Sequence, residues 1–220
     1  MLDKIKRDYC RITCYTSLQP KDIGLYRIGF EAIRNAGFRA VVLYRMGRWC
    51  RIHKMGIVAA ILERFMHHFC HCWISTLVDI SSGFMIAHVC GIIVDGASGP
   101  IGNNFSLRQN VTIGGNYGKN KNGRVQPLIG DNVSIGPGAA ILGPITIGSN
   151  TIIGANAVVT TDIPENSVVG CFRAEIVGKR DKEGNIFHEH ERVFISRREL
   201  FDKIKRLEEK LDHIEQMKNI

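Results

Sequence analysis

The sequence predicts a mainly β protein built on a parallel β-helix, with a helical region before it and a helix after it. Three observations support this fold class. An aliphatic residue recurs every six positions in the middle of the chain, turn-forming residues recur at the same interval, and both flanks show helical spacing instead. These patterns divide the chain into an N-terminal helical region (1–73), a β-helix (74–178) and a C-terminal tail with a short coiled-coil helix (179–220).

Residues 22–72 are expected to be helical, because their apolar side chains recur at spacings near three and four and glycines punctuate the pattern. The chain has a formal charge of +8, of which residues 1–79 carry +7. There are three alternatives for this basic region. It binds an anionic glycan, it binds a lipid-linked precursor at a membrane surface by peripheral association, or it has no particular partner.

The middle of the chain has a six-residue repeat that neither an α-helix nor an ordinary strand shows. Coils built from such repeats stack into a parallel β-helix with one continuous aliphatic core. Twelve repeats, at three to a coil, predict four coils. The repeating positions are Ile80, Ile86, Ile92, Ile101, Leu107, Ile113, Ile129, Ile135, Ile141, Ile147, Ile153 and Val159.

The residues between the aliphatic positions favour a corner in each repeat. Asn, Asp and Gly tolerate positive φ, and one of them stands three residues after the aliphatic position in eight of nine units. These nine positions are Asn104, Asn110, Asn116, Asn132, Gly138, Pro144, Asn150, Asn156 and Asp162. We therefore expect eight units to turn at the same point.

The C-terminal tail is expected to form a helix over residues 193–220. Its apolar residues alternate at spacings of four and three, which gives a seam of two to three heptads. A short coiled coil and a helix packed on the body are the two alternatives. The seam consists of Leu200, Ile204, Leu207, Leu211 and Ile214.

Composition excludes several classes of protein. The 45% apolar fraction fits neither a collagen-like nor a disordered chain, and the longest aliphatic run, residues 57–62, is far shorter than the ~18 residues of a membrane-spanning helix. No secretion signal is evident and seven cysteines lack regular spacing, which predicts a cytoplasmic protein. No nucleic-acid-binding module appears, and the His- and Cys-rich segment 67–72 matches no zinc pattern, so neither nucleic acid nor metal is expected.

Four segments carry a resemblance to a known family: Ile80–His88, Gly91–Val94, Gln109–Gly115 and Ile153–Val159. They resemble the hexapeptide-repeat acyltransferases, and within them serine acetyltransferase and its relatives from surface-polysaccharide gene clusters. The resemblance extends from about Asn35 to Gly178. It implies a left-handed β-helix, a homotrimer with sites between subunits, and acetyl-CoA as the acyl donor.

The resemblance places His88 at the family's catalytic histidine. An imidazole can accept the proton of an attacking hydroxyl near neutral pH and return it to the departing thiolate. A polar residue at a coil corner is the alternative for His88. The acid that orients this histidine in the family falls at Trp73 here, so Asp79 and Asp95 are candidate replacements, with solvated corner carboxylates as their alternative.

The family's cofactor groove predicts further contacts. Gly114 and Gly115 are candidates for stabilising an oxyanion or for close approach of the pantetheine arm, and Ala139 and Ala157 for backbone contacts to that arm. Phosphate contacts are expected from Arg173, Lys179 or Arg180.

The loop that interrupts the repeat is flexible and basic in composition, and in the family such a loop folds over a neighbouring active site. Its cations meet either CoA phosphates or an acidic glycan, and a solvated loop is the alternative. They are Lys119, Lys121 and Arg124.

The function expected first is acetyl-CoA-dependent O-acetyl transfer to a sugar hydroxyl of a capsule or lipopolysaccharide component. Two departures from serine acetyltransferase favour this carbohydrate acceptor. Ala87 replaces an Asp before the histidine, and Val125-Gln126-Pro127 replaces an Arg-His-Pro. The alternatives are a serine O-acetyltransferase of cysteine biosynthesis and a non-catalytic trimeric scaffold, which the loss of the acid at Trp73 favours.

Overall fold

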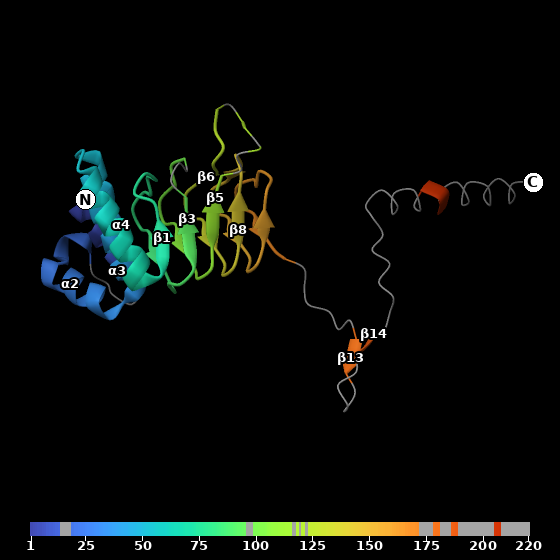
Figure 1. Cartoon of the computed structure of the whole chain (residues 1–220), viewed down its shortest axis with the longest axis horizontal. Coiled ribbons are helices and arrows are strands. Elements are labelled where there is room, and N and C mark those ends of the chain that lie inside the picture. The colour runs from blue at the N-terminus through green and yellow to red at the C-terminus, as the bar shows by residue number, and fades with distance from the viewer. Residues whose placement is uncertain are drawn as a thin grey trace, which may run out of the picture. The chain divides into compact units, whose positions relative to one another are not determined.

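The computed structural model describes residues 1–13, 19–95, 99–115, 118, 120–121, 123–171, 178–180, 186–188 and 205–207. The chain forms two compact units, Met1–Phe172 and Arg173–Ile220. The first unit holds the N-terminal helices and the β-helix, which Figure 1 shows stacked end to end.

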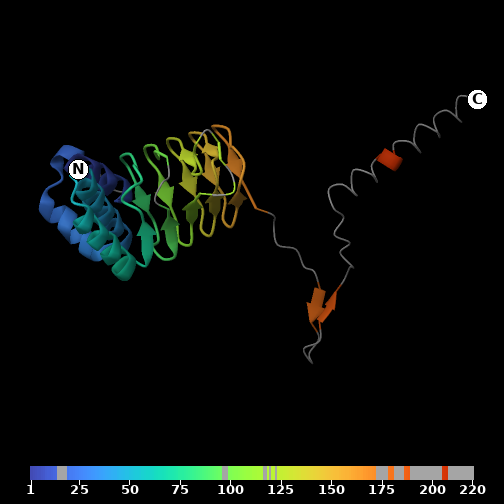
Figure 2. The same ribbon diagram turned by 45° about the horizontal axis from the view of Figure 1, so that its top comes forward.

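The N-terminal helices pack together and cover the first coil of the β-helix (Figure 2). Helix α1 lies in the region 1–73 that was predicted to be helical as a whole, and α2, α3 and α4 lie within the range 22–72 whose spacing was predicted to be helical. Helix α3 begins at Ala36 and is capped by Asn35, whose side chain accepts a hydrogen bond from the backbone N–H of Phe38 (3.1 Å). The helical elements are α1 (Leu2–Ile12), the 3-10 turn η1 (Pro20–Asp22), α2 (Leu25–Arg34), α3 (Ala36–Ile52) and α4 (Gly56–Cys70).

Three parallel sheets form the faces of the β-helix. Sheet 1 consists of β1 (Cys72–Ile74), β3 (Ile92–Val94), β5 (Thr112–Gly114), β8 (Ala140–Leu142) and β11 (Val158–Val159). Sheet 2 consists of β2 (Met85–Ile86), β4 (Ser106–Leu107), β7 (Ser134–Ile135), β10 (Ile152–Ile153) and β12 (Val168–Val169). Sheet 3 consists of β6 (Leu128–Ile129) and β9 (Thr146–Ile147), extended by parallel bridges at Ile80, Ile101 and Ile163. Each coil visits the sheets in the order 1, 3, 2.

The predicted aliphatic ladder forms the core. All twelve repeating positions are buried, and none exposes more than 4% of its surface. At the helical end of the core, Tyr44 of α3 packs edge-on against Phe84, which stacks on Phe105 of the next coil. The hydrophobic core is therefore continuous from the helices into the β-helix.

Two of the three corners use residues of positive φ, as predicted. Asn104, Asn132, Asn150 and Asn166 turn the chain from sheet 3 to sheet 2, and their side-chain amides form a ladder of hydrogen bonds of 2.9–3.1 Å. At the corner from sheet 1 to sheet 3 the prediction is wrong for Asp162, which has no positive φ and whose carboxylate accepts the N–H of Thr146 (2.7 Å). Pro144 is the position excepted from the prediction, and Gly143 beside it has the positive φ. Asn116 lies outside the described residues.

The β-helix has about five coils, so the predicted number of four is too low. The first rung, β1, packs against α4 and was not included in the prediction, because no Asn or Gly marks its corner even though Ile74 stands six residues before Ile80. The last rung escaped notice because the repeat slips after Val159. Its sheet 3 position is Ile163 rather than residue 165, and Val169 follows six residues later.

The second unit is described only in part. Strands β13 (Gly178–Arg180) and β14 (Ile186–His188) pair antiparallel, and Lys205–Leu207 are helical. Except for this short segment, the helix predicted for the tail lies outside the described residues.

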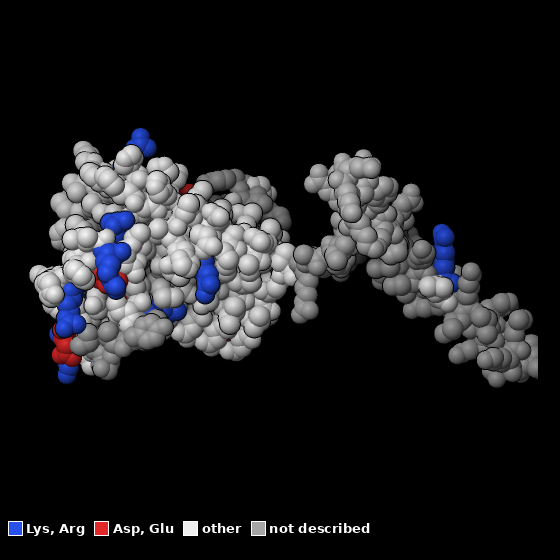
Figure 3. Space-filling view, turned by 90° about the horizontal axis from the view of Figure 1, so that it is seen from below, with Lys and Arg blue, Asp and Glu red and all other residues white. Residues whose placement is uncertain are grey.

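The surface of the helical end is basic on the side shown in Figure 3, where Lys and Arg gather over the helices. In the described part of the chain, no helix is both long and apolar enough to cross a bilayer.

Candidate active site

His88 lies in a corner where the chain passes from sheet 2 to sheet 1, between β2 and β3. The equivalent corners of the later coils follow beneath it, and together residues 87–91, 108–111, 136–139 and 154–157 are called the His88 edge. Backbone hydrogen bonds join these corners, for example from the N–H of Asn110 to the carbonyl of Cys90 (2.8 Å) and from the N–H of Gly138 to the carbonyl of Gln109 (3.0 Å). His88 is therefore the first of a stacked column of corners.

The start of α3 packs directly against the strand that leads to His88. A Cβ atom added to Gly37 would collide with the backbone carbonyl oxygen of Ile86, two residues before the histidine. Glycine at this position allows helix and strand to approach closely, and this approach fixes the helical region relative to the His88 edge.

Replacing Gly37 with Ala is expected to lower the free energy of unfolding by ~1–3 kcal/mol, because the new methyl group must displace backbone. Urea unfolding measures this change. Gly29→Ala is the matched control: an added Cβ there meets nothing within 4 Å, and an exposed helical Gly→Ala change is expected to stabilise by ~0.5–1 kcal/mol. Unfolding midpoints for the Gly37 variant equal to wild type would contradict the close packing.

A cavity of about 480 Å³ opens between the helices and the His88 edge. His88 and Ala87 line one side, and the end of α2 and the start of α3 line the other with Glu31, Arg34, Asn35 and Gly37. The His88 ring is exposed and makes no hydrogen bond or ion pair with another described residue. Within one chain His88 thus lines an open cavity whose opposite side includes Glu31 and Arg34.

A second hollow, of about 350 Å³, continues from Ala87 along sheet 2 and the His88 edge. Arg11, Arg108, Gly136, Pro137 and Gly154 are among its lining residues. Arg108 is exposed and lies one coil below His88. An extended ligand lying in this groove would end at Ala87, the residue before His88, and pass Arg11 and Arg108.

The predicted cofactor contacts Ala139 and Ala157 belong to the same edge as His88, one at the corner before β8 and one at the corner before β11. Ala139 is fully buried and Ala157 is only 3% exposed, backbone included, so within one chain neither residue presents a surface to a ligand. Arg173 lies outside the described residues, and Lys179 and Arg180 lie in β13 of the second unit.

The candidate orienting acids Asp79 and Asp95 lie away from His88. Both occupy the corner from sheet 1 to sheet 3, a different edge of the β-helix. Asp79 forms an exposed ion pair with Lys4 (3.4 Å), and the carboxylate of Asp95 accepts a hydrogen bond from the side-chain amide of Gln126 (3.3 Å). Within one chain neither carboxylate orients the histidine, because the two acids and His88 lie at different corners of the β-helix.

Gly114, Gly115 and the basic loop also belong to the corner from sheet 1 to sheet 3. Lys121 pairs with Asp162 at 2.6 Å, and Arg124 donates to the carbonyl oxygens of Pro144 and Ile145 (3.3 and 3.4 Å). The hydrogen bond from Lys121 lowers the pKa of the exposed Asp162 carboxyl. Lys119 lies outside the described residues. The two described cations fasten the loop to the chain's own later coils.

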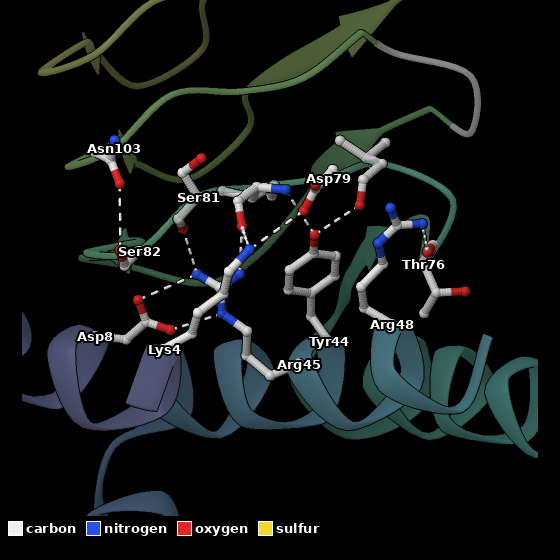
Figure 4. Close-up of polar contacts among 12 residues, drawn as sticks. Lys4, Asp8, Tyr44, Arg45, Arg48, Thr76, Asp79, Ser81, Ser82 and Asn103 are labelled. Atoms are coloured by element: carbon white, nitrogen blue, oxygen red, sulfur yellow. Dashed lines mark hydrogen bonds and ion pairs between the residues drawn. The ribbon is translucent and has the colours of Figure 1, made fainter. Parts of the chain in front are cut away.

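A buried ion pair fastens the helices to the first coil (Figure 4). Nε and Nη2 of Arg45 in α3 donate to the carboxylate of Asp8 in α1 at 2.8 and 3.2 Å. Asp8 also accepts the N–H groups of Gly83 and Phe84 (2.8 Å each), and Arg45 donates to the carbonyl oxygens of Ile80 and Ser81. The hydroxyl of Tyr44 donates to the carbonyl of Val78 (2.7 Å), and burial raises its pKa to about 12. Both carboxylate oxygens of Asp8 thus accept hydrogen bonds that join α1 to α3 and to the first coil.

The His- and Cys-rich segment is split between core and surface. Cys70 and Cys72 are buried, whereas His67, His68 and His71 are exposed. Burial raises the pKa of the Cys72 thiol to about 12, and in the described part of the chain no three potential ligands are placed to hold a metal ion together.

Three residues of this region were missed: Glu31, Arg34 and Arg108. Counting the repeat could have placed Arg108, since it follows Leu107 directly at the corner one coil after His88. No periodic signal connects α2 to residue 88, so Glu31 and Arg34 could be found only from the packing of α3 on β2.

Comparisons with known proteins agree with this architecture. The family model "Bacterial transferase hexapeptide (six repeats)" matches residues 127–161. The serine acetyltransferase of Bacillus pumilus is 33% identical over 150 residues, covering 68% of this chain and 68% of that protein. The serine acetyltransferase of Escherichia coli K12 is 36% identical over 147 residues, covering 67% of this chain and 53% of that protein.

Solved structures give the same result. Serine acetyltransferase isoform 3 of Entamoeba histolytica in complex with cysteine superposes with a TM-score of 0.67 at 25% identity, covering 82% of this chain and 61% of that one. The serine acetyltransferase of Neisseria gonorrhoeae gives a TM-score of 0.64 at 30% identity, covering 76% and 61%.

This chain therefore belongs to the hexapeptide-repeat acyltransferases, as a serine acetyltransferase-like member with their left-handed β-helix. It spans about half the length of the E. coli relative that it matches.

Proposed function

We propose that this chain is an acetyl-CoA-dependent O-acetyltransferase whose acceptor is serine and whose general base is His88. The observation that carries the proposal is that His88 lines an open cavity and that its neighbour, Ala87, lines both this cavity and a groove along sheet 2 and the His88 edge. The relatives' activity supports the choice of serine.

The reaction follows from this placement. His88 removes the proton of the serine hydroxyl as the oxygen attacks the thioester carbonyl of acetyl-CoA. A tetrahedral intermediate forms, the carbon–sulfur bond breaks, and the histidine returns the proton to the CoA thiolate. The products are O-acetylserine and CoA.

The groove supplies a place for the donor. Acetyl-CoA lies along the His88 edge, in the groove lined by Gly136 and Gly154, with Arg108 beside its negatively charged groups. Contacts of the pantetheine arm at Ala139 and Ala157 remain an expectation from the family resemblance, because both residues are buried within one chain. The cation at Arg108 attracts phosphate without needing Lys121 or Arg124, which the chain uses to hold its own loop.

A homotrimer is part of the proposal. The outer faces of the sheets expose large apolar side chains that a neighbouring chain would cover, namely Trp73, Ile93 and Val158 on sheet 1 and Ile152 and Val168 on sheet 2. A neighbouring chain would also supply the group that orients the exposed His88 ring.

A sugar hydroxyl is the second candidate acceptor. It is favoured by Ala87 and Gln126, which stand where the resemblance leads one to expect groups that grip an amino acid. The comparisons favour serine over this acceptor, which the sequence analysis placed first.

An acceptor panel tests the proposal. CoA release from acetyl-CoA is followed with a thiol reagent in the presence of serine, neutral hexoses, hexuronic acids or no acceptor. We expect serine to stimulate release and the hexoses not to do so. Release with a sugar alone would replace serine by the second candidate, and no release with any acceptor would favour the non-catalytic scaffold.

A further inference from the structure

The cavity at His88 is lined by the guanidinium of Arg34, which a nearly buried carboxylate binds. Arg34 ends α2 and stands in the cavity lining together with His88. Its Nε and Nη2 donate to one carboxylate oxygen of Glu31 at 3.2 and 3.0 Å. The Glu31 side chain is only 5% exposed, whereas that of Arg34 is 68% exposed.

This arrangement differs from an ordinary surface ion pair. Because Glu31 is nearly buried, it holds the inner edge of the guanidinium while the outer part faces the cavity. Nη1 of Arg34 donates no hydrogen bond to any described residue. A planar, fixed donor of this kind suits a carboxylate, with which it forms charge-assisted hydrogen bonds.

We propose that Arg34 binds the carboxylate of the acceptor while His88 removes the proton from the acceptor's hydroxyl. The inference rests on the proposed function and names the part of the acceptor that the chain recognises. Glu31 acts as a positioning residue for Arg34. Gln126, in the loop on the other edge, is then not needed to replace the lost amino-acid contacts.

The test couples a change in the protein to a change in the acceptor. Arg34→Gln is compared with wild type using serine and serinamide, which keeps the hydroxyl and the ammonium but lacks the carboxylate. Losing a hydrogen bond to a charged group costs ~1.5–3 kcal/mol, so the KM for serine should rise ~10- to 100-fold with kcat little changed. Wild type should show a similarly raised KM for serinamide. The KM of Arg34→Gln for serinamide should lie within about twofold of the wild-type value for serinamide.

Two further variants sharpen the comparison. Arg27→Gln is the matched control, because Arg27 is an exposed arginine of the same helix and does not line the cavity. It should keep the wild-type KM for serine. Arg34→Lys keeps the charge without the planar fork and should recover part of the affinity.

Each outcome decides the inference. Equal losses with serine and serinamide, or no change with serine, would overturn the role of Arg34 while leaving the proposed function intact. Wild type that acts only on sugars would overturn the proposed function, and the same comparison between a hexuronic acid and a neutral hexose would then decide Arg34. No CoA release with any acceptor would overturn both.

Discussion

Replacing His88 with Asn is expected to lower kcat by ~10²- to 10⁴-fold, the usual contribution of a general base. The hydroxyl of serine is a weak nucleophile unless its proton is being removed, and no other imidazole lines the described cavity. The KM for acetyl-CoA should change little, because the groove that would hold the donor lies along the later coils. Steady-state CoA release measures both constants.

Two controls separate this chemical role from a structural one. His88 is exposed and makes no hydrogen bond or ion pair with another described residue, so the unfolding curve of the variant should match that of wild type. His68→Asn, which changes an exposed histidine of α4, should retain wild-type kcat. Added imidazole should restore part of the turnover of His88→Ala, because the cavity is open to solvent. Wild-type kcat in His88→Asn would exclude the histidine as the base.

Replacing Asp8 with Asn is expected to lower the free energy of unfolding by ~3–5 kcal/mol. The change leaves the guanidinium of Arg45 buried without its counter-ion and weakens the hydrogen bonds to the N–H groups of Gly83 and Phe84. Both effects act where α1 and α3 meet the first coil. Denaturant unfolding followed by circular dichroism measures the loss.

The matched control is Asp3→Asn, an exposed position of the same helix, where a change within ~0.5 kcal/mol is expected. The double variant Asp8→Asn with Arg45→Met removes both charges and should recover part of the loss, because the uncompensated cation is gone. An unfolding midpoint of Asp8→Asn equal to that of wild type would show that the buried pair does not secure the helices.

The β-helix could be predicted from the sequence because its cause is local and repeated. Each rung needs one inward aliphatic residue, and the His88 edge and the Asn104 ladder need a residue that accepts positive φ. The first rung continues the aliphatic spacing, since Ile74 stands six residues before Ile80, but it lacks the Asn and Gly that mark the corners of the later coils. The last rung could not be predicted, because the spacing from Val159 to the next ladder residue, Ile163, is four residues instead of six.

The candidate site could be predicted only in part. Ala139 and Ala157 hold the same position in successive coils, each four residues after a sheet 2 ladder residue, and His88 lies at the same corner, two residues after Ile86. Asp79 and Asp95 are close to His88 in sequence but lie on another edge, since a few residues suffice to carry the chain round a corner. Glu31 and Arg34 reach the cavity through the packing of α3 on β2, which depends on the absence of a side chain at Gly37.

The central claim is that this chain transfers acetyl groups from acetyl-CoA to serine through His88. The most direct test is to incubate wild type and His88→Asn with both substrates and to measure O-acetylserine by mass spectrometry together with released CoA. We expect wild type to form the two products in equal amounts, and His88→Asn to form ~10²- to 10⁴-fold less of both in the same time. Release of CoA by wild type without O-acetylserine, or equal yields from the two proteins, would contradict the claim.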